Sequence, residues 1–253
     1  MIEVIIIGGG NVARHLAQAI LESDGIQLVQ IYNRTLQTIE DFKNKTSITD
    51  HIKALKKAGI YIICVSDQAI AGISEQLPQN NSLVVHTAGG VDMEILNKHR
   101  NMGVFYPLQS FSKDRKINFN EVPIGIEANT PENEALLQQL ADGLQNKYFL
   151  IDSNQRKKLH IAAVFVNNFV NHLYYIGQDI CKKNNLDPAI LNPLIQETAQ
   201  KTVPMNPLDA QTGPARRGDT ITVKNHLKKL TGINKEIYKL LSQSIADTYG
   251  KKL

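Results

Sequence analysis

The sequence of 253 residues is poor in cysteine and has no long apolar run. Its two cysteines, Cys64 and Cys181, lie far apart, so they form no disulfide framework and are typical of a reducing compartment. No run of about 18 apolar residues is present, which argues against a transmembrane helix. The first residues enter an apolar strand at once, which argues against a signal peptide. We therefore expect a cytoplasmic protein with no membrane partner.

Several motifs that would indicate other chemistry are also missing. The seven histidines form no H-E-x-x-H motif and no close pairing with cysteine, so we expect no metal site. No G-x-S-x-G motif indicates a hydrolase, and no Walker A lysine follows the glycines near the N-terminus. The basic residues are scattered and accompany no recognised binding motif or aromatic platform, so we expect no nucleic-acid partner.

The charge is distributed unevenly along the chain. The net charge of +4 combines −3 for residues 1–150 with +7 for residues 151–253. A basic second half can attract an anionic small-molecule substrate. The alternative, which we favour, is that these lysines and arginines lie on solvated helix faces.

What the sequence does contain is a glycine motif at its start. After a run of Val and Ile, Gly8, Gly10 and Ala13 fit the pattern G-x-G-x-x-A, and an amphipathic stretch follows. In a dinucleotide-binding turn, the first glycine permits the turn, the second lets a pyrophosphate approach the backbone, and the small third residue lets the helix pack closely. The residues predicted here to bind a dinucleotide are Gly8, Gly10, Asn11 and Val12. The alternative is a purely structural glycine turn.

The end of the second predicted strand, residues 26–32, indicates which dinucleotide binds. An enzyme that uses NAD usually has Asp or Glu there, about 20 residues beyond the glycines, to bind the ribose 2′-OH. This chain has Asn33, Arg34 and Thr35, so no carboxylate repels a 2′-phosphate and the guanidinium of Arg34 can bind it. We therefore predict that these three residues bind NADP(H). The alternative is that Arg34 is a solvated charge and that Thr35 caps the helix predicted after it.

The two halves of the chain have different patterns. The first 150 residues alternate between strands and helices, which predicts an α/β domain with a Rossmann-like, doubly wound and mostly parallel sheet. From Ser153 to Lys183 the periodicity is helical, and no strand pattern follows. We therefore expect an NADP-binding domain at residues 1–152 and an all-helical C-terminal domain at residues 153–253.

Ligands of doubly wound sheets bind beyond the carboxyl ends of the strands. Ser66 follows one predicted strand, while His86 and Thr87 end the next one. We predict that these three residues contact the nicotinamide half of the cofactor. His86 can donate to a ribose or a carboxamide, and the alternative is a histidine whose hydrogen bonds are satisfied at a strand end.

The long predicted helix carries a polar stripe. His160, Asn167 and Asn171 fall within about 40° of one another at about 100° per residue, and Asn168 lies farther round. A polar stripe beside an apolar face is where a helix borders a cleft. Histidine can supply a proton, and asparagine amides can orient a carbonyl or imine. The alternative is a helix edge that meets water or a partner subunit.

These motifs together resemble a family that joins an NADP-binding Rossmann-like domain to a C-terminal helical domain of unknown function. Its members are described as NADP oxidoreductases of a deazaflavin-dependent type. The segments that carry the resemblance are 8–13, 33–35, 86–89, 107–111, 159–172 and 212–219. More distantly, the chain is similar to pyrroline-5-carboxylate reductase and to the 6-phosphogluconate dehydrogenase superfamily. The resemblance implies Asn168 as a site residue and a dimer through the helical domains.

The sequence therefore predicts an NADP(H)-dependent oxidoreductase that transfers hydride between the nicotinamide and a small carbonyl or imine substrate. The residues predicted to act on the substrate are His160, Asn168 and Asn171. Relatives commonly have histidine where this chain has Tyr106, directly before Pro107. The alternative function is a non-catalytic NADP(H)-binding sensor or scaffold.

A homodimer is also expected. The helical domain has only about 100 residues, so it offers few partners for its apolar side chains. The apolar residues of the long helix that need such a partner are Phe165, Phe169, Leu173 and Ile176. A two-fold dimer through the helical domains would bury them.

Overall fold

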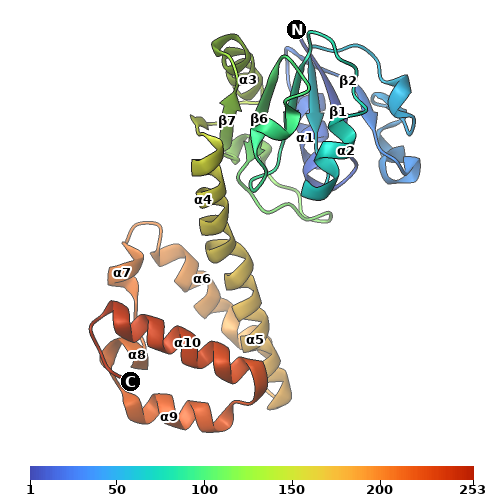
Figure 1. Cartoon of the computed structure of the whole chain (residues 1–253). Coiled ribbons are helices and arrows are strands. Elements are labelled where there is room, and N and C mark those ends of the chain that lie inside the picture. Colours follow the sequence, from blue (N-terminus) through green and yellow to red (C-terminus); the bar gives the residue numbers. More distant parts are fainter. The chain divides into compact units, whose positions relative to one another are not determined.

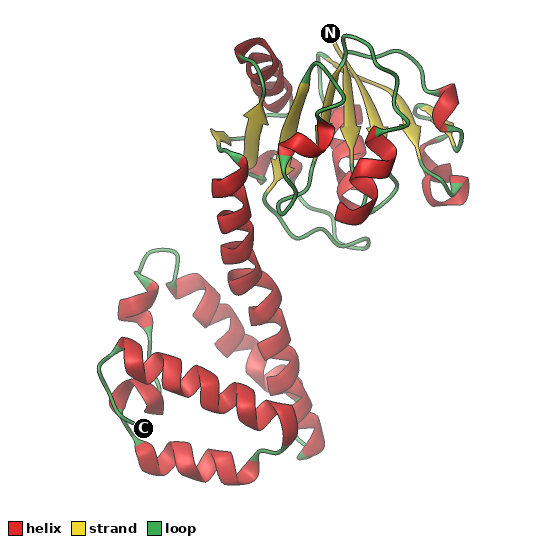
Figure 2. Ribbon diagram, in the orientation of Figure 1, coloured by secondary structure: helices red, strands yellow, loops and turns green.

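The computed structural model describes residues 1–253, which divide into two units, Met1–Asn167 and Asn168–Leu253. The first unit is a sheet with helices on both faces, and the second consists of helices (Figures 1 and 2). This arrangement confirms the prediction of a Rossmann-like α/β region followed by an all-helical region.

The sheet has eight strands in the order β3-β2-β1-β4-β5-β6-β7-β8. The strands are β1 (Ile2–Ile7), β2 (Ile26–Tyr32), β3 (Ser47–Thr49), β4 (Ile60–Ile63), β5 (Leu83–His86), β6 (Met102–Pro107), β7 (Ile124–Ala128) and β8 (Tyr148–Leu150). Neighbours are parallel except β6 and β7, which pair antiparallel. The strand order reverses between β1 and β4, so the carboxyl ends of these two strands border the crevice where such sheets bind ligands.

Side chains of the central strands alternate between two apolar layers, one on each face of the sheet. The helical segments of the first unit are α1 (Asn11–Glu22), η1 (Leu36–Phe42), η2 (Ile52–Ala54), η3 (Asp67–Ala69), α2 (Ile70–Ser74), η4 (Met93–Leu96), η5 (Phe119–Glu121), α3 (Pro131–Gly143) and α4 (Ser153–Ala163). Val4 and Ile6 pack with α1 and α3, whereas Ile5 and Ile7 pack with α2 and η4. Because both faces of β1 are covered, its sequence is almost entirely apolar.

The helix predicted after Thr35 is a 3₁₀ segment, η1, rather than a full α-helix. Only Ile39 and Phe42 in this segment are buried, so little apolar surface is available to hold a longer helix against the sheet. Thr35 precedes η1 but makes no side-chain capping bond. The capping interpretation of Thr35 is therefore wrong, and its hydroxyl is available for another role.

The long helix predicted from Ser153 is present, but it is not α-helical throughout. A capping box between Asp152 and Gln155 starts α4. Residues Val164–Phe169 form a π-helix, and α5 (Val170–Lys183) follows. The two units divide within this π-helical segment, whereas the sequence places the boundary at residue 152. The reason is that the first turns of α4 bond to loops of the sheet.

The second unit buries few large side chains. Its other helices are η7 (Pro188–Leu191), α6 (Asn192–Lys201), α7 (Pro207–Ala210), α8 (Pro214–Arg217), α9 (Thr220–Lys229) and α10 (Gly232–Thr248). Its buried residues are small or medium in size: Cys181, Ala210, Ala215, Val223, Ser242 and Ala246. Large apolar side chains such as Leu194 and Leu240 are exposed instead. None of the helices combines the length and the apolar composition that crossing a membrane requires.

Candidate functional site

The turn after β1 contains two glycines with different surroundings. Gly8 has a φ of +134°, and a Cβ there would lie 2.2 Å from the carbonyl oxygen of Cys64, so only glycine fits. Gly10 has open space around it, since a Cβ built there meets no atom within 4 Å. Ala13 is buried where α1 packs on the sheet. Gly8 is therefore required by the fold, whereas Gly10 leaves space for a ligand.

The N-terminus of α1 is open to an anion. Gly10 is its N-cap residue, no side chain caps the helix, and the first turn contains no acidic residue. The unpaired N–H groups of this turn and the positive end of the helix dipole therefore remain available. This arrangement fits the pyrophosphate of a dinucleotide, which binds at such helix ends.

A cleft of about 510 Å³ lies along the turn. Its lining comes from the ends of four parallel strands and from the segment after β6: Gly8, Gly9, Gly10, Asn11, Val12, Asn33, Cys64, Val65, Ser66, Thr87, Gln109 and Phe111. The cleft brings together seven of the ten residues predicted to bind the cofactor, and it lies at the point where the strand order reverses. Arg34, Thr35 and His86 are the three that do not line it.

Asn33 shapes the wall of the cleft at the end of β2. Its side-chain amide donates to the carbonyl oxygen of Thr35 at 2.8 Å and packs against Gly9, where a Cβ would lie 2.8 Å from Cγ of Asn33. The next residue, Arg34, is exposed and makes no ion pair. Its guanidinium is therefore not engaged by a carboxylate of the chain, and the binding of an anion by Arg34 stays a prediction.

The structure corrects the interpretation of His86 as a cofactor contact. The side chain is completely buried, and both ring nitrogens have partners within the domain. Nδ1 accepts from the backbone N–H of Ala88 at 3.1 Å, and Nε2 lies 3.3 Å from the carbonyl oxygen of Asp92. Burial, reinforced by the charge of Arg156, lowers the pKa of His86 to about 4, so the ring is neutral. His86 therefore holds the loop after β5 and does not reach a ligand.

The segment after β6 supplies another wall of the cleft. Gln109 and Phe111 belong to residues 108–118, which we call the strap, between β6 and η5. The side-chain amide of Asn11 donates to the carbonyl oxygen of Phe111 at 2.9 Å. His15, one turn farther along α1, lies 3.1 Å from the carbonyl oxygen of Ser112. The strap is thus held against the first turns of α1.

A polar pair lies at the carboxyl end of β6. The hydroxyl of Tyr106 and Nδ1 of His160 are 3.2 Å apart, and the two rings meet edge to face. Gly89 packs against both residues, and a Cβ there would lie 2.6 Å from Nδ1 of His160. Burial raises the pKa of Tyr106, so the phenol keeps its proton. The sequence singled out His160 but did not connect it with Tyr106.

A buried arginine fixes the loop that packs against this pair. Arg156 is completely buried, and one of its Nη atoms contacts the carbonyl oxygens of Ala88, Gly89 and Val91 at 3.1, 3.3 and 2.6 Å. Its other Nη atom lies 2.8 Å from the carboxylate of Glu127 on β7. This arrangement, which we call the Arg156 brace, joins α4, the loop after β5 and β7. It positions Gly89 beneath His160.

The remaining predicted catalytic residues, Asn168 and Asn171, belong to the second unit and are exposed. Asn168 lies in the π-helical segment, and Asn171 lies in the first turn of α5. The predicted stripe assumed a uniform rotation per residue, which the π-helix interrupts, so the calculated angle between His160 and Asn171 is wrong. A π-helical turn often marks a functional site, so this segment remains a candidate part of one.

The glycine and arginine cluster at residues 211–220 forms a loop that is closed by its own side chains. Arg216 donates to the carbonyl oxygen of Gln211, and its guanidinium lies 5.2 Å from the ring centroid of Tyr249. Gly213 and Gly218 have positive φ angles, which the turns around α8 require. These contacts hold the loop in place within the second unit.

The reversal of strand order, the open helix N-terminus and the glycine turn define a dinucleotide-binding protein of the doubly wound α/β class. Comparisons with known proteins agree. The family model described as "NADP oxidoreductase coenzyme F420-dependent" matches residues 3–90, and "Domain of unknown function (DUF2520)" matches residues 122–245. The chain belongs to the family of NADP oxidoreductases that combine these two domains.

One solved structure, from Bacteroides fragilis and described as a candidate NADP oxidoreductase, is 38% identical. The match covers 97% of this chain and 98% of that one, with a TM-score of 0.88. Pyrroline-5-carboxylate reductase from Streptococcus pyogenes is 15% identical, covers 98% of each chain and has a TM-score of 0.67. A reductive aminase from Aspergillus terreus, solved with NADPH and ethyl levulinate, is 11% identical over 100% of this chain and 96% of that one, with a TM-score of 0.71. These last two show the shared fold. No curated protein matches the sequence.

Proposed function

We propose that the protein reduces a small carbonyl or imine compound with NADPH as the hydride donor. The observation that carries this proposal is the cleft beside the open N-terminus of α1, at the strand reversal. A polar pair lies at the end of β6, the strand that precedes the strap. The distant likeness to a pyrroline-5-carboxylate reductase and a reductive aminase supports an imine or carbonyl substrate.

In this proposal the chain holds the cofactor through backbone groups, neutral side chains and the guanidinium of Arg34. The first turn of α1 binds the pyrophosphate, and Arg34 binds the 2′-phosphate from the end of β2. Ser66 and Thr87 contact the nicotinamide half at the ends of β4 and β5. When bound, NADP(H) supplies the hydride chemistry, and the protein supplies orientation and polarity.

The Tyr106–His160 pair supplies the proton that the substrate takes up together with the hydride. His160 in its doubly protonated form donates a proton from Nε2 to the oxygen or nitrogen of the substrate and is left as the neutral ring, while its Nδ1–H donates to the oxygen of Tyr106 and so orients the ring. Asn168 and Asn171 orient the substrate in this proposal. Such a pair favours an enzyme over a sensor or scaffold, because binding alone needs no proton donor.

The test is steady-state oxidation of NADPH against a panel of cyclic imines and 2-keto acids. We expect turnover of at least one class, and Tyr106→Phe should lower kcat about 10²-fold with little change in NADPH affinity. Tyr174→Phe, the same change in the second unit, is the matched control. Tight NADPH binding with no reduction of any compound would contradict the enzyme and favour the sensor or scaffold.

We also propose that the protein acts as a homodimer through its second unit. That unit exposes many large apolar side chains on several helices, including Leu173, Ile190, Leu194, Ile233 and Leu240. Phe169 of this unit and Phe165, which lies just before the end of the first unit, are also more than one third exposed. So many exposed large apolar side chains are unusual for a monomer, and a two-fold partner is the commonest way to cover them.

A further inference from the structure

A second compartment adjoins the cofactor cleft. It has a volume of about 490 Å³, and its lining residues are Gly9, Asn11, Arg14, Gln37, Thr38, Asp41 and Lys113. Gly9 and Asn11 line both spaces, so the compartment continues from the glycine turn. Gln37 and Thr38 belong to η1, which follows the strand end where the ribose of a dinucleotide binds. The compartment therefore lies between the glycine turn and the segment that recognises the adenosine ribose.

The charges facing this compartment are two cations and one carboxylate. Arg14 pairs with Asp41, with Nη1 3.0 Å from Oδ1, and also donates to the carbonyl oxygen of Thr38. The Arg14 guanidinium lowers the pKa of Asp41, so the carboxylate is ionised and offsets that arginine. Lys113 forms none of the ion pairs of the structure. The uncompensated positive charge is therefore that of Lys113.

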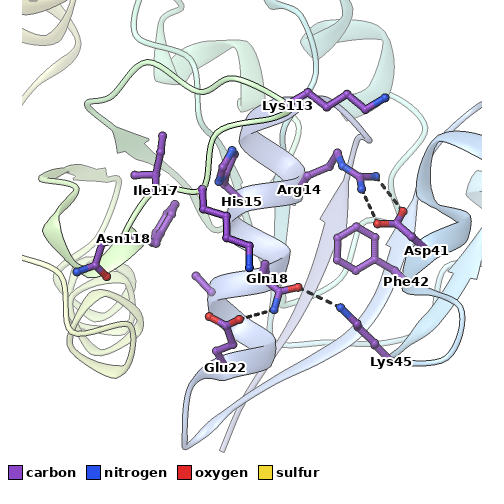
Figure 3. A pocket seen from close by; sticks show the side chains of 13 residues that line it. Arg14, His15, Gln18, Glu22, Asp41, Phe42, Lys45, Lys113, Ile117 and Asn118 are labelled. Carbon is purple, nitrogen blue, oxygen red and sulfur yellow. Dashed lines mark hydrogen bonds and ion pairs between the residues drawn. The ribbon is translucent and has the colours of Figure 1, made fainter.

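Lys113 reaches this position because the strap is anchored just before it. Asn11 holds the carbonyl oxygen of Phe111, and His15 holds that of Ser112. The rings of His15 and Phe111 also pack together, with centroids 5.2 Å apart. Figure 3 shows the side chain of Lys113 extending across the N-terminal end of α1, beyond Arg14. Two side chains of α1 thus fix the position of the backbone directly before Lys113.

We propose that Lys113 is a specificity-determining residue that binds the 2′-phosphate of NADP(H) in this compartment, opposite the hydrogen-bonding groups of Gln37 and Thr38. This inference rests on the proposed function and adds a cation from the strap to Arg34. A lysine ammonium suits a phosphate dianion as a point charge, while Thr38 offers a hydroxyl donor. The pyrophosphate itself is bound at the helix N-terminus, so it does not need this lysine.

The same strap provides a matched control. Lys116 carries the same charge three residues farther along, but it lines a different groove, of about 460 Å³, on the flank of α1. That groove, which Figure 3 shows, shares Arg14, Asp41 and Lys113 with the compartment. It continues along α1 to Gln18 and Glu22 and does not include the glycine turn, so Lys113 lines both spaces whereas Lys116 lines the groove but not the compartment. Lys113→Gln and Lys116→Gln therefore make the same change in net charge at two different places.

Isothermal calorimetry with NADPH and NADH on the full-length protein tests the proposal. We expect the wild type to bind NADPH at least ~10-fold tighter than NADH, and Lys113→Gln to raise the Kd for NADPH about tenfold. The Kd for NADH should stay within about twofold, and Lys116→Gln should change neither value.

An equal loss for NADPH and NADH in Lys113→Gln would overturn the proposal, because it would place the lysine on the pyrophosphate. Unchanged NADPH binding in Lys113→Gln, or an equal loss in Lys116→Gln, would overturn it as well. Each of these results leaves the proposed function intact. A wild type that binds neither nucleotide contradicts the proposed function and this inference together.

Discussion

At the scale of single residues, substitutions of Gly8 and Gly10 distinguish an effect on stability from an effect on ligand binding. Gly8→Ala places a Cβ 2.2 Å from the carbonyl oxygen of Cys64 at a φ of +134°. We expect it to lower the free energy of unfolding by about 1–3 kcal/mol from backbone strain alone. Gly10→Ala meets no protein atom, so it should leave stability unchanged and weaken NADPH binding at least ~10-fold.

Urea denaturation and calorimetry on both glycine variants make this comparison. Gly8→Ala serves as the control that shows what a steric clash in the turn does to the denaturation midpoint. If Gly10→Ala binds NADPH as tightly as the wild type, the pyrophosphate does not lie against this turn.

Because His86 is buried as a neutral ring, we expect the protein to lose stability in mild acid. The pKa of His86 falls from 6.5 to about 4 in the folded protein, so unfolding takes up a proton below pH 6.5. The stabilisation by the neutral ring is complete above pH 6.5 and declines as the pH falls toward 4. The slope due to this group is about 1.4 kcal/mol per pH unit.

Denaturant titrations of the wild type and of His86→Gln, from about pH 7 to about pH 5, measure this slope. The variant should be less stable at neutral pH but should lose less stability on acidification. Parallel pH dependences in the two proteins would show that His86 is not the group that titrates.

Several site residues follow from local sequence, and others do not. Gly8, Gly10 and Asn33 were predictable because a strand end, a tight turn and a helix start impose strong local patterns. The role of Arg156 was not predictable. The neighbouring Lys157 is also a basic residue in the same predicted helix, and only the fold determines which of the two side chains is buried. The partnership of Tyr106 with His160 likewise joins two residues far apart in the chain, and nothing local indicates it.

At the scale of secondary-structure elements, the Arg156 brace holds α4, β7 and the loop after β5 together. Arg156→Met would leave Glu127, whose side chain is only 13% exposed, without its counter-charge. We expect the free energy of unfolding to fall by about 3–5 kcal/mol. Lys157→Met, which breaks the half-exposed pair with Asp92, is the control and should cost less than about 1 kcal/mol.

A double-mutant cycle with Glu127→Gln separates pairing from packing in the brace. The double variant should recover part of the loss, because it no longer buries an unpaired carboxylate. Strictly additive losses would show that Arg156 acts through the three carbonyl oxygens and not through Glu127.

At the scale of the whole molecule, the exposed apolar surface of the second unit predicts a dimer. Light scattering at micromolar concentration should report about twice the chain mass of 28.2 kDa. Leu240→Glu should shift the protein toward the monomer, because the side chain is 73% exposed and apolar. Lys239→Glu, one position earlier on α10, is the control. A wild type that stays monomeric would contradict the interface.

The overall architecture was accessible from sequence because strands and helices alternate in one half and only helical periodicity follows. Two features of the fold were not predicted from the sequence. Strand β3 has three residues, too few for a recognisable pattern. The interruption of the long helix at Val164–Phe169 was not visible either, because a π-helix has no sequence signal as clear as a capping residue or a proline.

The Arg156 brace has a consequence for dividing the chain into fragments. A fragment that ends at residue 152 contains all eight strands, yet it lacks the arginine that neutralises Glu127 and holds the carbonyl oxygens of the loop after β5. It also lacks His160, so Tyr106 would have no partner. Expression trials of the nucleotide-binding half should therefore extend to residue 167, where the first unit ends.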